Sequence, residues 1–188
     1  MHTKDEHRLR IQNWRSSLSQ HTWKAMSEAI CHNLYQLDIL SSAKRIHSFW
    51  PLLAKNEVDI RPLLRKLTRD GVEVYLPVMK NAQMHHGLFT TEESMISGPY
   101  GILEPMHYEK VPPLNLDAIL VPALATDHKG NRIGYGAGIY DRFLATAGCP
   151  LISPVFGDQV VSGIRKEPHD VCVDTLVTER SIHHVRTM

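Results

Sequence analysis

The segment GNRIGYGAGIYDRFL, residues 130–144, follows the apolar run AILVPAL at 118–124 and leads into a helical pattern. Its three glycines at every second position leave backbone amides uncovered, so that an anion can approach them closely. A helix that opens at Gly138 adds free N–H groups and the positive end of its dipole. Arg132 stands before these glycines and Asp141 after them. An arginine, bare amides and a carboxylate are typical of a site for a polyphosphate with magnesium.

The spacing of the glycines matches neither of two well-known phosphate-binding patterns. The dinucleotide fingerprint requires a glycine where Ile139 stands, and the P-loop requires a Gly-Lys-Ser/Thr ending. A tight turn between a strand and a helix, with no ligand, therefore explains the segment equally well when it is taken alone.

Composition narrows the class of protein. The chain has 188 residues, of which 43% are apolar and 22% charged, as in an ordinary globular domain. The formal net charge of +1 argues against a nucleic-acid partner. We find no signal peptide and no apolar run long enough to span a membrane. Three widely separated cysteines favour a reduced, cytoplasmic setting.

Apolar periodicity predicts alternating helices and strands in the first half of the chain. Steps of three and four residues predict helices over 4–18 and 23–37, the second capped by Ser19 or Thr22. Residues 45–50 and 72–77 read as strands, and a helix between them is expected to be capped by Asp59 and to stop at Gly71. A strand–helix–strand unit with short connections is parallel and right-handed.

The second half is less regular. We expect strands at 84–90, 151–156 and 182–185, a loop at 97–105, a helix from 139 to 148 and a short helix near 159–161. The adjacent histidine pairs 85–86 and 183–184 are expected at the surface. The whole predicts one α/β domain over residues 1–188. An open parallel sheet places its site at the carboxyl ends of its strands, where the glycine segment and Glu57 both fall.

Several short motifs in this order resemble those of the 5-formyltetrahydrofolate cyclo-ligase (5,10-methenyltetrahydrofolate synthetase) family. The most specific is RIGYGAGIYD at 132–141. The others are Lys4 with Arg8, NEVD at 56–59, GILEP at 101–105, HD at 169–170 and TE at 178–179. Together they cover nearly the whole chain.

The resemblance implies a single three-layer αβα domain with a mainly parallel, Rossmann-like central sheet. It also implies that ATP, with Mg²⁺, drives the cyclisation of 5-formyltetrahydrofolate to 5,10-methenyltetrahydrofolate through a phosphorylated formyl group. The partners are then two small molecules, 5-formyltetrahydrofolate and ATP, and the protein is a monomer or a weak homodimer.

The resemblance also assigns roles to individual residues. Arg132 and Tyr140 would act in catalysis, and Asp141 and Asp170 would hold the metal. The ATP contacts would come from Lys4, Arg8, Arg132, Gly134, Tyr135, Gly136, Ala137, Gly138, Ile139 and Tyr140. The folate contacts would come from Trp50, Leu52, Glu57, Glu104 and Tyr140.

Two positions in the glycine segment depart from the usual pattern of that family. Ala137 stands where glycine or lysine is usual, and Ile139 replaces an aromatic residue. These departures leave two alternatives open: a relative that uses the ATP site on another substrate, and a non-catalytic nucleotide-binding protein.

Overall fold

A seven-stranded sheet forms the centre of the computed structural model, which describes residues 3–110 and 115–185. The strand order is β12-β11-β9-β6-β1-β2-β3, and the five inner strands are parallel, whereas β3 and β12 pair antiparallel at the edges. Their bounds are β1 Arg45–His47, β2 Glu73–Lys80, β3 Gln83–Phe89, β6 Ala118–Leu120, β9 Leu151–Pro154, β11 Thr175–Val177 and β12 Ile182–His184. The prediction of a mainly parallel α/β sheet is confirmed.

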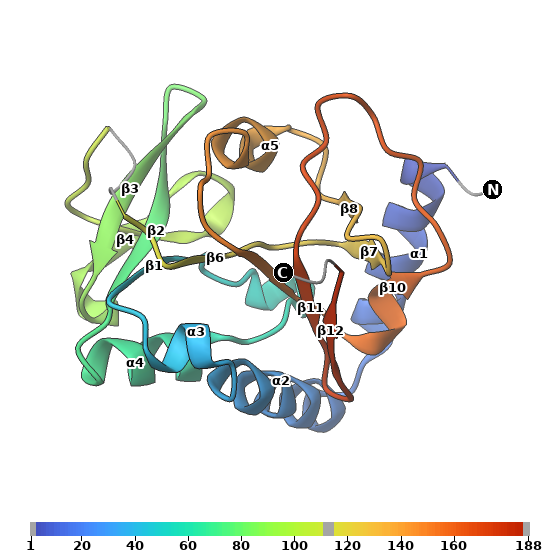
Figure 1. Ribbon diagram of the computed structural model, residues 1–188, viewed down its shortest axis with the longest axis horizontal. Coiled ribbons are helices and arrows are strands. Elements are labelled where there is room, and N and C mark those ends of the chain that lie inside the picture. The colour runs from blue at the N-terminus through green and yellow to red at the C-terminus, as the bar shows by residue number, and fades with distance from the viewer. Residues whose placement is uncertain (1–2, 111–114, 186–188) are drawn as a thin grey trace.

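Helices cover both faces of this sheet: α2 Gln20–Tyr35, α3 Asp38–Ser41 and α4 Arg61–Arg69 lie on one face and α5 Ile139–Leu144 lies on the other (Figure 1). Helix α1 Lys4–Ser17 packs instead on a second, smaller sheet. Ala118 and Leu120 of β6 join a core cluster with residues of α2, α3 and α4. Ile119, which points to the other face, joins a cluster with Leu144 of α5. The alternation of β6 thus produces the three layers.

A second, small sheet lies under the N-terminal helix. Its strands are β10 Val160–Val161, β7 Ala125–Asp127 and β8 Arg132–Ile133. Ile11 of α1 packs in a cluster with Leu124, Ile133 and Val161 from this region. The remaining short elements are the hairpin of β4 Met95–Ser97 with β5 Leu103–Pro105, and four 3₁₀ turns: η1 Leu53–Lys55, η2 Glu92–Ser94, η3 Pro99–Gly101 and η4 Gly157–Gln159.

The helix ends follow local side-chain chemistry in most cases. Thr3 accepts a hydrogen bond from the backbone N of Glu6, whose carboxylate accepts one from the Thr3 backbone N, so α1 begins with a capping box. Ser19 caps α2, as predicted. The prediction that Asp59 caps α4 holds in part. Ile60 occupies the N-cap position without a side-chain cap bond. Asp59 Oδ1 still accepts the backbone N–H of Arg61, the first residue of α4, at 3.2 Å, and the same carboxylate pairs with the Arg61 guanidinium.

The second half of the chain, where the apolar pattern is less regular, contains elements that were not predicted from the sequence. Strand β11 was not predicted. The short helix expected near 159–161 is present only as the 3₁₀ turn η4, which ends at Gln159; Val160 and Val161 form β10, which pairs parallel with β7. The loop expected at 97–105 contains β5 and the end of β4. Helix α5 ends at Leu144 rather than at Gly148.

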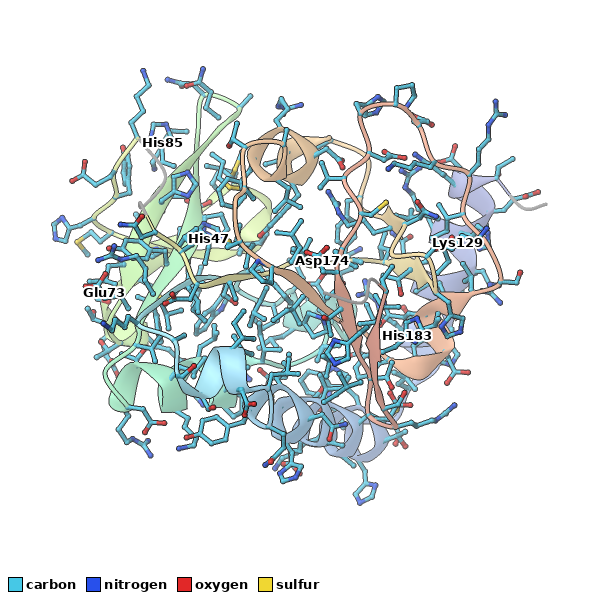
Figure 2. The ribbon with its side chains drawn as sticks, in the orientation of Figure 1. His47, Glu73, His85, Lys129, Asp174 and His183 are labelled. Carbon is cyan, nitrogen blue, oxygen red and sulfur yellow. The ribbon has the colours of Figure 1, made fainter. Side chains whose placement is uncertain are left out.

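Buried polar groups also lie within the fold. His47 is in the interior, whereas Lys129 is at the surface (Figure 2). His86 is only 3% exposed, so the expectation that this histidine lies at the surface is wrong. Its Nδ1 is 3.0 Å from Nε2 of His47. No helix in the described ranges is both long enough and apolar enough to cross a membrane.

Candidate active site

The glycine loop, residues 134–138, joins β8 to α5. Gly136 has φ of 107° and Gly138 has φ of 62°, a left-handed conformation that L side chains rarely adopt. Gly138 is the residue that caps α5, so the helix opens where the sequence predicted. The backbone path therefore requires glycine at 136 and 138, where no side chain then covers the loop amides.

Helix α1 brings two cations to this region. The Arg8 Nε donates a hydrogen bond of 2.9 Å to the Gly134 carbonyl, and a Cβ on Gly136 would lie 3.7 Å from Arg8 Nη2. One turn earlier, Lys4 Nζ lies 2.8 Å from Oδ2 of Asp170 and 3.2 Å from Oε1 of Glu167. Their i, i+4 spacing places both cations on the helix face that meets the loops.

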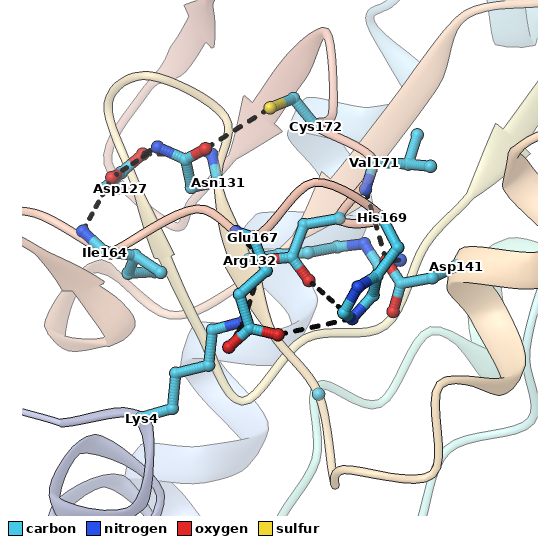
Figure 3. A network of polar contacts seen from close by, with 12 residues as sticks. Lys4, Asp127, Asn131, Arg132, Asp141, Ile164, Glu167, His169, Val171 and Cys172 are labelled. Atoms are coloured by element: carbon cyan, nitrogen blue, oxygen red, sulfur yellow. Dashed lines mark hydrogen bonds and ion pairs between the residues drawn. The ribbon is translucent and has the colours of Figure 1, made fainter.

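Arg132 and Asp141 form a partly buried ion pair at the two ends of the glycine loop (Figure 3). Arg132 Nη2 donates to Oδ1 of Asp141 at 2.7 Å, and the same oxygen accepts the backbone N–H of Val171 at 3.2 Å. Burial lowers the pKa of Arg132, and the Asp141 carboxylate opposes that effect. The guanidinium is therefore fixed beside the loop amides by a carboxylate.

Asp170 belongs to a separate group of charges with Lys4, Glu167 and His169, three residues that lie close together in Figure 3. Burial raises its pKa, but hydrogen bonds from Lys4 and from the Glu167 backbone outweigh that effect and leave the pKa below its ordinary value. Within the described ranges, Glu167, His169 and Asp170 place one ligand atom each within 4.8 Å of one another. Two carboxylates suit Mg²⁺, although the imidazole does not. Asp141 belongs to the Arg132 pair rather than to this group.

Glu57 contacts the glycine loop from another part of the chain, the segment that follows η1. Asn56 ends η1 with φ of 46°, and this left-handed residue turns the chain so that Glu57 is buried. Its Oε2 accepts the Leu52 backbone N–H at 2.8 Å, and its Oε1 accepts the Tyr135 hydroxyl at 3.2 Å. Burial raises the pKa of Glu57. The half-buried Leu52 is its apolar neighbour.

Tyr140 lies near Glu57 and Arg132, whose charges both act on it. Its hydroxyl is buried and has no hydrogen-bond partner among the described residues. Burial raises its pKa, the charge of Glu57 acts in the same direction, and the charge of Arg132 opposes both. The side chain can therefore donate a hydrogen bond and stays neutral at physiological pH.

Two of the predicted folate residues occupy other surroundings. Trp50 is 5% exposed and packs on Phe89, with ring centroids 5.5 Å apart, so its ring is part of the core. Glu104 is buried on β5, where Oε1 accepts the Met79 backbone N–H at 3.0 Å. Its Oε2 has no hydrogen-bond partner in the described chain. Folate contacts from these two residues stay predictions.

Asp127 is a supporting residue that the sequence analysis did not select. Its Oδ1 accepts the backbone N–H groups of Lys129 and Asn131, both at 3.0 Å. Its Oδ2 accepts the Asn131 side chain and the Ile164 backbone N–H, both at 2.9 Å. These bonds close the β7–β8 turn that leads into Arg132 (Figure 3). The Asp-x-x-Gly sequence at 127–130 was the available signal.

Arg15 was also missed. It follows Ile11 by four residues and therefore lies on the buried stripe of α1. A charged residue at a core position was its sequence signal. Its contacts, described below, connect the glycine loop to Glu57.

Cations, glycine amides and carboxylates meet beyond the parallel sheet, as in α/β enzymes that bind phosphate esters. A family model described as the 5-formyltetrahydrofolate cyclo-ligase family matches residues 1–179. The Haemophilus influenzae 5-formyltetrahydrofolate cyclo-ligase is 31% identical over 73% of this chain and 75% of its own length. The Saccharomyces cerevisiae enzyme of that name is 30% identical, with 97% and 99% covered.

Solved structures agree with the sequence matches. The Aquifex aeolicus 5,10-methenyltetrahydrofolate synthetase superposes with a TM-score of 0.87 and is 30% identical, over 98% of this chain and 94% of that one. The Mycoplasma pneumoniae protein of the same activity has a TM-score of 0.74 at 22% identity, over 94% and 98%, and supports the fold alone.

The chain belongs to the 5-formyltetrahydrofolate cyclo-ligase family. Its activity is that of an ATP-dependent ligase of this family, a 5-formyltetrahydrofolate cyclo-ligase.

Proposed function

We propose that residues 1–188 act as one domain that binds ATP, Mg²⁺ and 5-formyltetrahydrofolate together and cyclises the folate through a phosphorylated intermediate. The formyl oxygen attacks the γ-phosphorus of ATP and ADP leaves. The N10 nitrogen then attacks the activated formyl carbon and loses its proton. The C–O bond to the phosphate breaks, which gives 5,10-methenyltetrahydrofolate and inorganic phosphate.

One observation carries this proposal. The glycine loop touches the cation Arg8 at Gly134 and the carboxylate Glu57 through Tyr135. Two kinds of ligand group, one for phosphate and one for a polar heterocycle, therefore meet at a single loop.

The nucleotide half needs position and charge rather than a protein nucleophile. We assign phosphate contacts to Lys4, Arg8, Arg132 and the loop amides of residues 134–140. Arg132, held by Asp141, would neutralise the charge that develops during phosphoryl transfer. Ala137 and Ile139 offer only their backbone groups to the phosphates.

Mg²⁺, when bound, would neutralise phosphate oxygens and orient them for transfer. Asp141 and Asp170 have the oxygen donors that this cation prefers. In the structure Arg132 pairs with the first carboxylate and Lys4 with the second, so each would exchange part of that pairing for the ion.

The folate half is formed by a carboxylate and apolar surface. Glu57 would accept hydrogen bonds from the amino-pteridine, with Leu52 in apolar contact. The Tyr140 hydroxyl, which has no hydrogen-bond partner among the described residues, would donate a hydrogen bond near the reacting formyl group.

The assay is the ultraviolet absorbance of the methenyl product, followed with and without ATP and Mg²⁺. We expect product only with both, and Arg132→Ala and Asp141→Ala should each lower kcat by at least about 10²-fold while the fold survives. Lys129→Ala, an exposed cation near the same hairpin, is the matched control. Full activity in both site variants would refute the loop assignment.

The altered positions 137 and 139 support one alternative, in which the same site serves another substrate. A thermal melt separates the two. 5-Formyltetrahydrofolate in the presence of a non-hydrolysable ATP analogue should raise the Tm of the cyclo-ligase, and no shift would favour the alternative.

A further inference from the structure

The guanidinium of Arg15, on α1, is buried between the two halves of the proposed site. Arg15 is 1% exposed, whereas arginine is almost never fully buried unless it is paired. Its Nη2 donates a hydrogen bond of 2.7 Å to the Tyr135 hydroxyl. Its Nη1 lies 3.9 Å from Oε1 of Glu57. The buried charge is therefore directed at the other two residues of this contact.

Arg15, Tyr135 and Glu57 form a closed set of contacts. The Tyr135 hydroxyl accepts from Arg15 and donates to Oε1 of Glu57 at 3.2 Å. Tyr135 belongs to the glycine loop, and Glu57 follows η1, 78 positions earlier in the chain. The backbone oxygen of Arg15 also accepts a hydrogen bond of 2.8 Å from the Asn56 side chain. One residue thus holds both segments.

Stability alone is a weak explanation for this arrangement. Apolar side chains of similar volume often replace a buried ion pair without loss of stability. The ring of Tyr135 adds little apolar burial, because this residue is 46% exposed while its hydroxyl reaches inward to the charged pair. The distinctive effect of the contact is to fix where the glycine loop and the Glu57 carboxylate lie relative to each other.

We propose that Arg15 is a positioning residue that couples the nucleotide loop to the folate-binding carboxylate through Tyr135. This inference rests on the proposed function, which assigns the loop to ATP and Glu57 to the pteridine. ATP that orders residues 134–138 also fixes Tyr135, and Tyr135 with Arg15 then holds Oε1 of Glu57 in place for the folate. Thermodynamic reciprocity requires that folate raise the affinity for ATP by the same factor.

The electrostatics act in the same direction. Burial raises the pKa of Glu57, and the positive charge of Arg15 and the hydrogen bond from Tyr135 both oppose that rise. A carboxylate that accepts hydrogen bonds from a ligand must be ionised. Arg15 therefore supports both the place and the charge of Glu57.

The test compares two variants. Arg15→Met keeps most of the side-chain length but removes the charge, whereas Arg15→Lys keeps the charge but loses the planar guanidinium with its several N–H donors. Calorimetry gives the Kd of a non-hydrolysable ATP analogue with and without 5-formyltetrahydrofolate, and the Kd of the folate with and without the analogue. We expect a mutual enhancement of about fivefold or more in the native protein. This enhancement factor should fall to about one, which means no coupling, in Arg15→Met and should recover partly in Arg15→Lys.

Kinetics supply a second readout. Arg15→Met should raise the KM for 5-formyltetrahydrofolate by about tenfold, with a smaller change in kcat, because it removes a hydrogen bond between charged and buried groups. Without the charge of Arg15 the pKa of Glu57 should rise further. As pH falls, Arg15→Met should therefore begin to lose folate binding at a higher pH than the native protein does. Arg10→Met, an exposed arginine of the same helix, should behave as the native protein.

Each outcome is decisive. Native coupling and native KM in a folded Arg15→Met protein would overturn the inference, as would the absence of coupling in the native protein. If Arg15→Met does not fold, Tyr135→Phe removes only the linking hydroxyl from a partly exposed side chain, and the same loss of coupling is required of it. Failure of the native protein to convert 5-formyltetrahydrofolate would instead overturn the proposed function, whatever the variants do.

Discussion

The helices that carry site residues and the helices that do not are held in place by different forces. Helix α2 buries Trp23, Ile30 and Leu34, and α4 buries three leucines, all in one apolar cluster. Helix α1 buries Ile11 together with His7 and Arg15, and α5 buries only Leu144. The scaffold helices are therefore stabilised by apolar packing, whereas α1 and α5 combine apolar packing with hydrogen bonds and ion pairs to the neighbouring loops.

This difference has a physical consequence. Apolar packing is non-directional and sets how stable the protein is, whereas hydrogen bonds and ion pairs fix the orientation of particular side chains. Substitutions in α2 should therefore change stability without changing ligand affinity. Substitutions in α1 and around α5 should do the reverse, or should make stability depend on pH.

The largest expected effect is in the scaffold. Ile30→Ala removes a fully buried side chain from α2 and should lower the free energy of unfolding by about 2–5 kcal/mol. The KM values for ATP and folate should stay near native, because α2 contributes no proposed ligand contact. Urea unfolding and steady-state kinetics measure the two. A large rise in either KM in a folded variant would show that α2 also positions ligand-binding groups.

Low pH should destabilise the protein at the contact between α5 and two buried histidines. The Phe143 ring of this helix packs on His47 and His86, with centroids 4.6 and 5.1 Å away. Burial lowers the pKa of His86 from 6.5 to about 4. The unfolded chain therefore binds a proton between these values that the folded protein does not, and stability must fall as pH drops from about 6.5 to about 4.

His86→Gln should remove its share of that acid sensitivity, up to about 3 kcal/mol near pH 4. The measurement is urea unfolding at several pH values from 7 to 4. His32→Gln, an exposed histidine of α2, is the control and should keep the native slope. An unchanged slope in His86→Gln would show that protonation of this histidine is not coupled to unfolding.

Affinity for ATP should respond to Arg8 on α1. Loss of a charged hydrogen-bond donor is worth about 1.5–3 kcal/mol, so Arg8→Ala should raise the KM for ATP by about 10- to 100-fold. Arg8 is only partly buried, and its removal should leave the Tm nearly unchanged. Exposed Lys24→Ala on α2 is the matched cation control. A native KM would remove Arg8 from the nucleotide site.

The smallest effects should come from the helix caps, because one cap belongs to α1 and the other to α2. Thr3→Ala on α1 and Ser19→Ala on α2 each remove a side-chain cap worth about 1 kcal/mol. The two variants should lose similar stability by thermal melting. Only Thr3→Ala should also raise the KM for ATP, because Lys4 and Arg8 lie in the first turns of α1. Equal kinetics in the two variants would contradict this.

Regular elements with a long apolar period were predictable. Helices α1, α2 and α4, strands β1 and β2 and the start of α5 follow directly from spacing, caps and glycines. Strands β10 and β11 were not predicted from the sequence. They are strands only because β7 and β9 offer them backbone partners.

The candidate site divides in the same way. Charged residues next to glycines, such as Arg132 and Asp141, have a local signal, and the sequence therefore nominates them as site residues. The position of Arg15 on the buried stripe of α1 is visible in the sequence, but nothing in its own segment shows that Glu57 and Tyr135 approach it. The pairing of Lys4 with Asp170 joins residues 166 positions apart and could not be deduced from spacing.

Local backbone preferences and ordered motifs were enough to specify the α/β class, the glycine loop with its carboxylate and arginine, and the family. Which polar groups face one another follows only from the fold: Lys4 with Asp170, Arg132 with Asp141, and Arg15 with Tyr135 and Glu57. Electrostatic contacts depend on distance in space, and that distance is set by the packing of α1 against the small sheet and by the turn at Asn56.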